Sequence, residues 1–291
     1  MTLAPAAPPA PALRWGAGAL GQALQPLLPG LVVEVVAAIG STNTELLARA
    51  RQVPAGALAP TLLVAEQQTA GRGRQGKAWQ SSVGASLTFS LALPLAMADW
   101  SGLSLAVGLA LADALDPPAP GTPPRLGLKW PNDLLLLDDG GRAPHIGRKL
   151  GGILIETVQA GTQRVAVIGI GLNIQPLPAD AGAGQPALSW GRADVQALQP
   201  GLDAPATLAR VAPPLAAALR AFEAQGFAPL QAAFARRDVL AGRQVATTLP
   251  ALPQGLADGV DATGTLWLRT PDGGRQPVSS GDVSLRPATP C

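Results

Sequence analysis

The apolar residues of this chain gather in short runs, each bounded by polar, glycine or proline positions. Runs of this length that are rich in Val, Ile and Leu predict β-strands. The predicted strands are LVVEVVAAI (31–39), TLLVAEQQ (61–68), ASLTFSLALPL (85–95), RLGLKW (125–130), DLLLL (133–137), KLGGILIET (149–157) and QRVAVIGIGLNI (163–174).

Helical periodicity separates some of these runs. STNTELLARARQ follows the first strand, and Thr42 and Glu45 have the spacing of a capping box. Residues 100–115 repeat small and apolar side chains at helical spacing. Further helices are predicted at 206–224 and at 228–237. Pro213 and Pro214 should interrupt the first of these two helices.

The character of the chain changes near residue 239. Short β-rich runs such as GVDATGTLWLRT alternate there with glycine and Asp-Gly turns, which predicts a small β-barrel. The predicted fold class is α+β, with a mixed central sheet, helices and a C-terminal β-barrel. We expect a poorly ordered Pro/Ala-rich lead-in over 1–30, a main domain over 31–237 and the barrel over 238–291.

Composition excludes several classes of site. Among the 291 residues there is one cysteine, Cys291, and one histidine, His145. An intrachain disulfide, a zinc site of Cys and His ligands and a His-based triad are therefore excluded. The N-terminus lacks the pattern of a signal peptide, and no apolar run is long enough to span a membrane. The formal net charge of only +2 does not indicate a nucleic-acid-binding surface.

Scarce residues indicate where the chemistry lies. The chain has only three lysines and three asparagines, since arginine supplies its other positive charges. Lysine and arginine are not interchangeable, so a retained lysine indicates a need for a compact ammonium group. All six lie in motif-like blocks, namely Asn43, Lys77, Lys129, Asn132, Lys149 and Asn173.

The block GRGRQGKAW (71–79) supports more than one interpretation. It matches a dinucleotide-binding glycine pattern and a P-loop, but no convincing helix follows, and Ala78 occupies the P-loop's Ser/Thr position. A plain surface loop is one alternative. The other is a glycine-hinged loop in which Arg72 and Arg74 bind an anion and Trp79 stacks on a flat ring.

The remaining blocks each have a structural and a functional interpretation. STN (41–43) caps a helix or binds a polar ligand, and KWPND (129–133) is a polar turn or a polar site. RKLGG (148–152) either protects a sheet edge or lets a ligand come close to its glycines. GIGLN (169–173) is either a simple turn or part of a ligand pocket. Five such blocks within one region are consistent with a single pocket.

These blocks, in this order, closely resemble those of the biotin–protein ligases. The resemblance rests on STN, EQQTAGRGRQGKAW, GASLTFS, KWPNDLLL, RKLGGILIE, VIGIGLNI and the ending GDVSLRP, and it covers about 31–287. It implies a catalytic domain similar to class II aminoacyl-tRNA synthetases, shared with lipoate ligases, and an SH3-like C-terminal barrel. Ser86 departs from the asparagine that relatives often carry in the third strand.

The resemblance also implies a two-step reaction. Biotin and MgATP give biotinyl-5′-AMP, and a specific lysine of a biotin carboxyl carrier domain then takes the biotin. Lys149, Arg74 and Asp133 are the implied catalytic residues. The implied biotin-binding residues are Ser41, Thr42, Asn43, Gln68, Arg72, Gly73, Arg74, Lys149, Gly152 and Gly169. The implied ATP-binding residues are Trp79, Lys129, Asn132, Asn173 and Arg286.

No residue is assigned to metal, because the ATP phosphates are expected to hold Mg²⁺. The implied partner is the carrier domain of acetyl-CoA carboxylase or a related carboxylase, and a homodimer is left open. Residues 1–30 are too short and proline-rich for a helix-turn-helix domain, so we expect no sequence-specific DNA binding. Few cysteines and no signal peptide fit a cytoplasmic enzyme. The alternatives are a lipoate or octanoate ligase, a non-catalytic biotin-binding sensor and a nucleic-acid-binding module.

Overall fold

The computed structural model describes residues 11–53, 58–97, 99–137, 146–177 and 191–278, together with the backbone of 286–287. The chain divides into two compact units. Unit 1 combines the described residues of 11–96, 151–177 and 193–213, and unit 2 combines those of 97–150, 191–192 and from 214 onwards. His145 lies outside the described residues.

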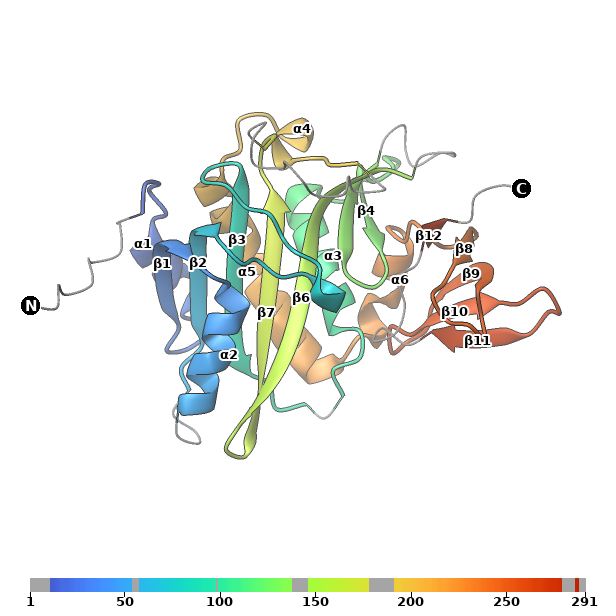
Figure 1. Cartoon of the computed structure of the whole chain (residues 1–291), viewed down its shortest axis with the longest axis horizontal. Coiled ribbons are helices and arrows are strands. Elements are labelled where there is room, and N and C mark those ends of the chain that lie inside the picture. The colour runs from blue at the N-terminus through green and yellow to red at the C-terminus, as the bar shows by residue number, and fades with distance from the viewer. Residues whose placement is uncertain are drawn as a thin grey trace, which may run out of the picture. The chain divides into compact units, whose positions relative to one another are not determined.

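Unit 1 is built on strands that run side by side in the order β1-β2-β3-β7-β6 (Figure 1). The strands are β1 (Val32–Ile39), β2 (Thr61–Gln68), β3 (Ser86–Pro94), β6 (Arg148–Ala160) and β7 (Gln163–Asn173). β1 and β2 are parallel, whereas the pairs β2·β3, β3·β7 and β6·β7 are antiparallel. β3 and β7 have nearly every residue buried, which explains why both read as almost continuous apolar runs.

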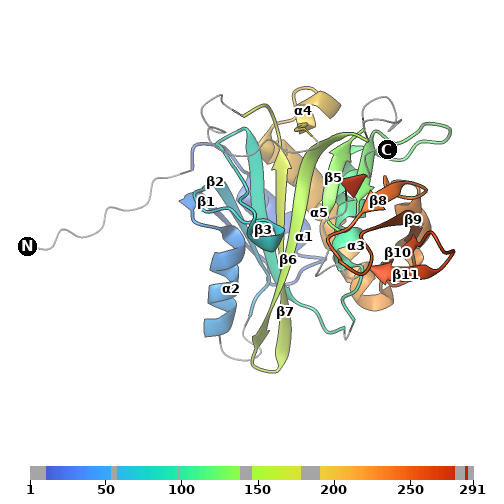
Figure 2. The ribbon, with the colours of Figure 1, turned by 45° about the vertical axis from the view of Figure 1, so that its right-hand side comes forward.

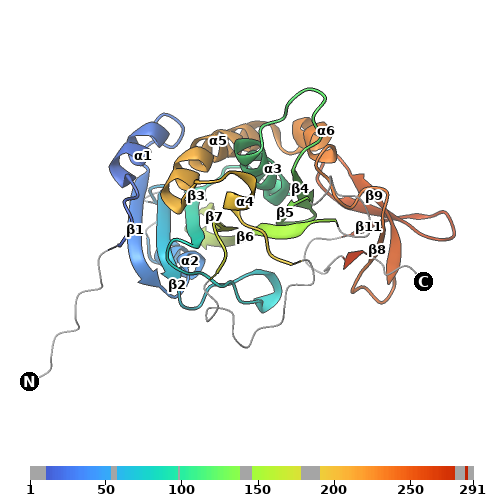
Figure 3. The same ribbon diagram turned by 90° about the horizontal axis from the view of Figure 1, so that it is seen from above.

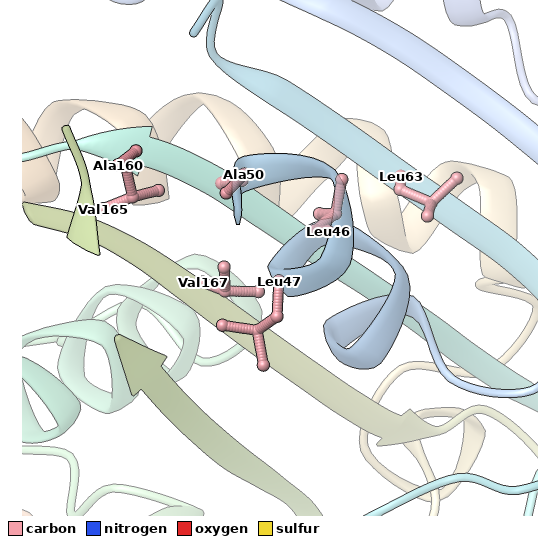
Figure 4. Close-up of a cluster of buried hydrophobic side chains, with 8 residues drawn as sticks. Leu46, Leu47, Ala50, Leu63, Ala160, Val165 and Val167 are labelled. Atoms are coloured by element: carbon pink, nitrogen blue, oxygen red, sulfur yellow. The ribbon is translucent and has the colours of Figure 1, made fainter. Parts of the chain in front are cut away.

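Helix α2 (Thr42–Gln52) lies against strands β2, β3 and β7 (Figure 2). Its apolar residues Leu46, Leu47 and Ala50 form a core cluster with Leu63, Ala92, Ala160, Val165 and Val167 (Figure 4). The predicted capping box is one residue out of register. Ser41 is the N-cap, since its oxygen accepts the N–H of Thr44, and Glu45 pairs with Arg49 instead.

The predicted lead-in contains a helix that its composition did not indicate. Helix α1 (Ala17–Leu24) lies on the opposite side of the strands from α2 (Figure 3). The carboxylate of Glu66 on β2 accepts the N–H groups of Ala12 and Leu13 at 2.7 and 2.6 Å and the indole N–H of Trp15 at 3.0 Å. Burial raises the pKa of Glu66, but these three hydrogen bonds outweigh it and leave the pKa below its usual value. Glu66 therefore fixes this segment as a buried carboxylate.

Unit 2 contains β4 (Leu126–Lys129), β5 (Asp133–Leu136) and the first residues of β6. Its helices are α3 (Leu103–Leu115), α6 (Gln231–Ala235) and the 3-10 turn η2 (Ala228–Leu230). β4 and β5, which were predicted as consecutive strands, form an antiparallel hairpin.

The C-terminal segment of unit 2 forms a five-stranded antiparallel sheet in the order β11-β10-β9-β8-β12. The strands are β8 (Gln244–Ala246), β9 (Gln254–Val260), β10 (Leu266–Arg269), β11 (Arg275–Val278) and β12 (Arg286–Pro287). Trp130 on the β4–β5 turn donates its indole N–H to the carbonyl oxygen of Gly264 at 3.1 Å. The C-terminal sheet is thereby tied to the KWPND turn.

Two further helices complete the described chain. α4 (Val195–Leu198) begins at Asp194, whose carboxylate accepts the N–H of Ala197. α5 (Ala204–Gln225) runs through Pro213 and Pro214, so the predicted interruption is wrong. The apolar face of α5 is buried on both sides of the proline pair, as at Leu208 and Leu219, and this burial offsets the hydrogen bonds that proline removes. Within the described residues, no helix has the length and apolar character needed to cross a membrane.

Asp238 should make the stability of unit 2 depend on pH. Its Oδ1 accepts the N–H of Leu240, whereas its Oδ2 is buried and meets no hydrogen-bond donor among the described residues. Burial raises the pKa of Asp238 from 3.8 to about 6, although the N–H groups of Leu240 and Ala241 oppose the rise. A raised folded-state pKa means that stability is fully present below the unfolded pKa and is lost as the pH rises through the folded pKa.

We therefore expect Asp238→Asn to raise the free energy of unfolding at pH 8 by about 2 kcal/mol. The gain should shrink as the pH falls from 6 towards 4, because the wild-type carboxyl group then becomes protonated and is neutral like the amide. Urea denaturation of both proteins across this range measures the difference. A gain that is the same at every pH would contradict the assignment.

Candidate active site

The STN motif and the end of β2 form a buried polar cluster in unit 1. The backbone N–H of Thr42 donates to Gln68 Oε1 at 2.7 Å, and Thr42 Oγ1 lies 2.6 Å from Ser90 Oγ. Asn43 is buried and uses its amide within the protein, since Nδ2 donates to Leu154 O at 3.1 Å and to Glu156 Oε2 at 3.0 Å. The structure thus brings Ser41, Thr42 and Gln68 together, as predicted, but it gives Asn43 protein partners.

The loop over 71–79 is a closed hairpin. Arg72 and Ala78 form an antiparallel bridge, and Trp79 N–H donates to Gly71 O at 2.8 Å. A short 3-10 turn, η1 (Arg74–Gly76), forms the tip, where Gly76 takes a positive φ of 71°. The hairpin carries Arg72 exposed and Arg74 half-buried. No helix follows it, which agrees with the rejection of both phosphate-loop interpretations.

Glycines on β7 make room for side chains of the site. A Cβ on Gly169 would lie 2.3 Å from Asn43 Oδ1, and a Cβ on Gly171 would lie 2.4 Å from Trp79 Cε2. Gly169, Gly171 and Asn173 alternate along the strand and therefore share one face. Gly152 on β6 pairs with Gly171, and Asn173 Nδ2 donates to Ala193 O at 2.9 Å. The structure explains Gly169 by the room it leaves for Asn43; its predicted contact with biotin remains a proposal.

The indole ring of Trp79 lies against Gly171, and its Nε1 is buried without a hydrogen-bond partner among the described residues. We expect Gly171→Ala to displace this ring and to lower the free energy of unfolding by about 1–3 kcal/mol, the usual cost of overpacking. Gly18→Ala is the matched control, because a methyl group there meets no atom within 4 Å. Urea denaturation compares the two variants, and equal losses would contradict the close packing of Trp79.

Three charged residues of unit 2 form the second group. Lys149 Nζ lies 2.7 Å from Asp133 Oδ1, and Lys129 Nζ lies 3.9 Å from Asp133 Oδ2. The side chains are only 21%, 18% and 7% exposed for Lys149, Asp133 and Lys129, so water screens them weakly. These three described side chains together carry a net charge of +1, which suits the binding of an anion.

Local structure holds this cluster in place. Lys129 and Asp133 are opposite residues of the β4–β5 hairpin, and the N–H of Asn132 donates to Lys129 O at 3.1 Å across the turn. The backbone N–H of Lys149 donates to Gly191 O at 3.1 Å. Arg286 lies on β12, where its backbone pairs with Ala246, so its predicted contact with ATP remains a prediction.

Sequence reasoning missed Ser90 and Glu156, which bind Asn43. A signal was present, because Ser86, Thr88 and Ser90 alternate on the otherwise apolar strand β3 and therefore lie on one face. Among the described residues, no group of three or more His, Cys, Asp or Glu side chains could hold a metal ion. Within the described part of the chain, Asp133 is the carboxylate of the charged cluster, and both of its oxygens face lysines, so this donor set does not fit a protein-held Mg²⁺.

Comparison with known proteins identifies the family. Residues 35–173 match the biotin/lipoate A/B protein ligase family, and residues 241–286 match the biotin protein ligase C-terminal domain. The chain is 35% identical over 258 residues to the biotin–[acetyl-CoA-carboxylase] ligase of Paracoccus denitrificans, covering 86% of this chain and 98% of the relative. The chain belongs to the biotin protein ligases.

A second relative supports the family assignment, and a solved structure supports the fold. The biotin–[acetyl-CoA-carboxylase] ligase of Mycobacterium tuberculosis is 41% identical over 150 residues, and the match spans half of each chain. The solved biotin protein ligase from Aquifex aeolicus, in complex with biotin and ATP, has a TM-score of 0.68 at 24% identity and matches 88% of this chain and 99% of that one. The predicted fold class is confirmed, with a mixed central sheet, helices and a C-terminal antiparallel domain.

Proposed function

We propose that this biotin protein ligase activates biotin with MgATP and transfers it to a lysine of a biotin carboxyl carrier domain, as in acetyl-CoA carboxylase. In the first step the biotin carboxylate attacks the α-phosphorus of ATP, and pyrophosphate leaves. In the second step the acceptor amine attacks the acyl carbon, an amide forms and AMP leaves. The proposed location of the reaction is the cytoplasm, which the scarcity of cysteine supports.

The observation that carries the proposal is the cluster of Lys149, Asp133 and Lys129 in a member of this family. A carboxylate that attacks a triphosphate brings two anions together, so the main catalytic requirement is fixed positive charge. Asp133 orients the Lys149 ammonium, and Lys129 offsets the negative charge that Asp133 adds. Mg²⁺ enters as part of the substrate MgATP.

The biotin molecule matches the polar cluster of unit 1. Its ureido end needs a few donors and acceptors, which Ser41, Thr42 and Gln68 supply, and the rest of the ring system is apolar. Gly152 and Gly169 give backbone that the biotin ring can approach. Asn43 acts indirectly, through its hydrogen bonds with Ser90 and Glu156. Lys149 lies three residues before Gly152 on the same strand. We assign Lys149 to the carboxylate end of biotin.

The hairpin and the remaining residues serve the nucleotide. Arg72, Gly73 and Arg74 cover the acyl-adenylate and exclude water, which would otherwise hydrolyse the mixed anhydride. The residues assigned to ATP are Trp79, Lys129, Asn132, Asn173 and Arg286. No side chain has to act as a nucleophile, which agrees with a chain whose only cysteine is Cys291.

The test incubates the protein with biotin, MgATP and a carrier domain, and measures the mass of the carrier. We expect one biotinyl group on one lysine, no product without ATP and none on a carrier whose target lysine is replaced by arginine. Lipoate and octanoate, supplied in place of biotin, test the lipoate-ligase alternative. Binding of biotin without transfer would favour the sensor alternative and would contradict the proposal.

A further inference from the structure

Four side chains of unit 1 form one continuous hydrogen-bonded relay. It runs from Thr42 through Ser90 and Asn43 to Glu156. Thr42 Oγ1 lies 2.6 Å from Ser90 Oγ, Ser90 Oγ lies 2.6 Å from Asn43 Oδ1, and Asn43 Nδ2 lies 3.0 Å from Glu156 Oε2. Thr42, Asn43 and Ser90 are buried and Glu156 is half-buried, so the first three members of the relay are shielded from water.

The acceptors at the Glu156 end of the relay determine which atom donates each of its hydrogen bonds. Asn43 Nδ2 faces the carbonyl oxygen of Leu154 and the carboxylate of Glu156, and an ionised carboxylate and a carbonyl oxygen can only accept. These two acceptors fix the orientation of the amide, so Asn43 Oδ1 must face Ser90 and accept a hydrogen bond from its hydroxyl group. A serine hydroxyl has one proton, and Ser90 has therefore none left for Thr42. Thr42 is the donor in the contact with Ser90.

The relay sets what Thr42 can offer a ligand. Thr42 Oγ1 could donate either to Ser90 Oγ at 2.6 Å or to Gln68 Oε1 at 3.1 Å, but it has one proton, and we assign that proton to the shorter contact with Ser90. Thr42 Oγ1 is left as an acceptor. Gln68 Oε1 takes the backbone N–H of Thr42, so the amide of Gln68 presents Nε2 as a donor. One acceptor beside one donor complements the N–H and C=O of a cyclic urea.

We propose that Ser90 and Glu156 are positioning residues that act through Asn43 to hold the Thr42 hydroxyl as an acceptor, and so select a ligand with a ring N–H. This inference rests on the proposed biotin ligase function, because biotin supplies the urea. Neither Ser90 nor Glu156 needs to touch the ligand. Without the relay, the hydroxyl of Thr42 can turn and donate its proton.

The test measures binding by calorimetry, so it does not depend on turnover. The ligands are biotin and the two cyclic carbamate analogues in which oxygen replaces one or the other ureido N–H. The variants are Ser90→Ala, Glu156→Ala and the conservative Glu156→Gln, whose amide oxygen can still accept from Asn43. Thr157→Ala is the control, since Thr157 is exposed and is the next residue on β6.

We expect wild type to prefer biotin over one of the carbamates by at least tenfold, because that ring oxygen would face the Thr42 acceptor. In Ser90→Ala and Glu156→Ala, biotin should bind about tenfold more weakly and the preference should fall, whereas Glu156→Gln and Thr157→Ala should stay within about twofold of wild type. An unchanged preference in both alanine variants, or a Glu156→Gln as weak as Glu156→Ala, would overturn the relay. Wild type that binds biotin with this preference but labels no carrier would refute the proposed function and leave the relay standing.

Discussion

Lys149→Ala is expected to lower the rate of adenylate formation by about 10²–10³-fold, the effect of removing one preorganised charge-stabilising group. The substitution changes the net charge of the cluster from +1 to zero, because Asp133 remains beside Lys129. Two anionic substrates would then meet without a net positive charge at this cluster. The loss should appear mainly in the maximal rate, since charge that builds up in the transition state is what the ammonium group stabilises.

Release of pyrophosphate in the presence of biotin and MgATP, without a carrier domain, isolates this step. Arg51→Ala is the control, because Arg51 is an exposed cation in the last turn of α2. Lys149→Arg keeps the charge but replaces a compact ammonium group with a planar fork, so we expect only partial activity. Near-normal release of pyrophosphate by Lys149→Ala would remove this residue from the mechanism.

Arg237→Met is expected to lower the free energy of unfolding by about 3–5 kcal/mol, the range for breaking a buried ion pair by removing one partner. Arg237 is 5% exposed. Its Nε donates to Asp113 Oδ1 and its Nη1 to Asp116 Oδ2, both at 2.9 Å, and Nη1 also reaches the carbonyl oxygen of Leu126. The guanidinium group thus joins the C-terminal end of α3 to the start of β4.

The same residue supports the charged cluster through its backbone. Arg237 O accepts the N–H of Leu128, the neighbour of Lys129, at 2.7 Å. Methionine would fill most of the space but would leave the carboxylate of Asp116 without its buried cation. Urea denaturation gives the change, and Arg236→Met is the matched control because Arg236 is exposed. A loss below about 1 kcal/mol would show that the ion pairs of Arg237 contribute little net stability.

Local patterns were sufficient for the strands but not for their arrangement. β4 to β7 were predicted in sequence order because each is an apolar run that ends in turn residues. The pairing of β3 with β7 joins strands that are far apart in the chain, and no local pattern contains it. Helix α1 was missed because it contains two glycines and no charged residue, and Glu66 holds the segment before it through contacts from a distant strand.

The candidate site shows the same division. Lys149 and Lys129 were predicted from their scarcity and Asp133 from its motif, and the structure brings the three side chains together. Asn43 was predicted as a ligand contact, but the structure gives its amide to Glu156, Leu154 and Ser90. A motif shows which side chains are required, whereas only the fold shows which of them are already bonded to the protein. The assigned contacts with biotin and ATP remain proposals for the same reason.

The most direct test of the account follows the α-phosphate of ATP. The protein is mixed with biotin and α-labelled MgATP without a carrier domain, and the bound material is analysed before and after the carrier is added. The proposed mechanism predicts biotinyl-AMP held by the protein, which disappears as biotin appears on the carrier lysine and AMP is released. Formation of ADP, or AMP that is never joined to biotin, would contradict it.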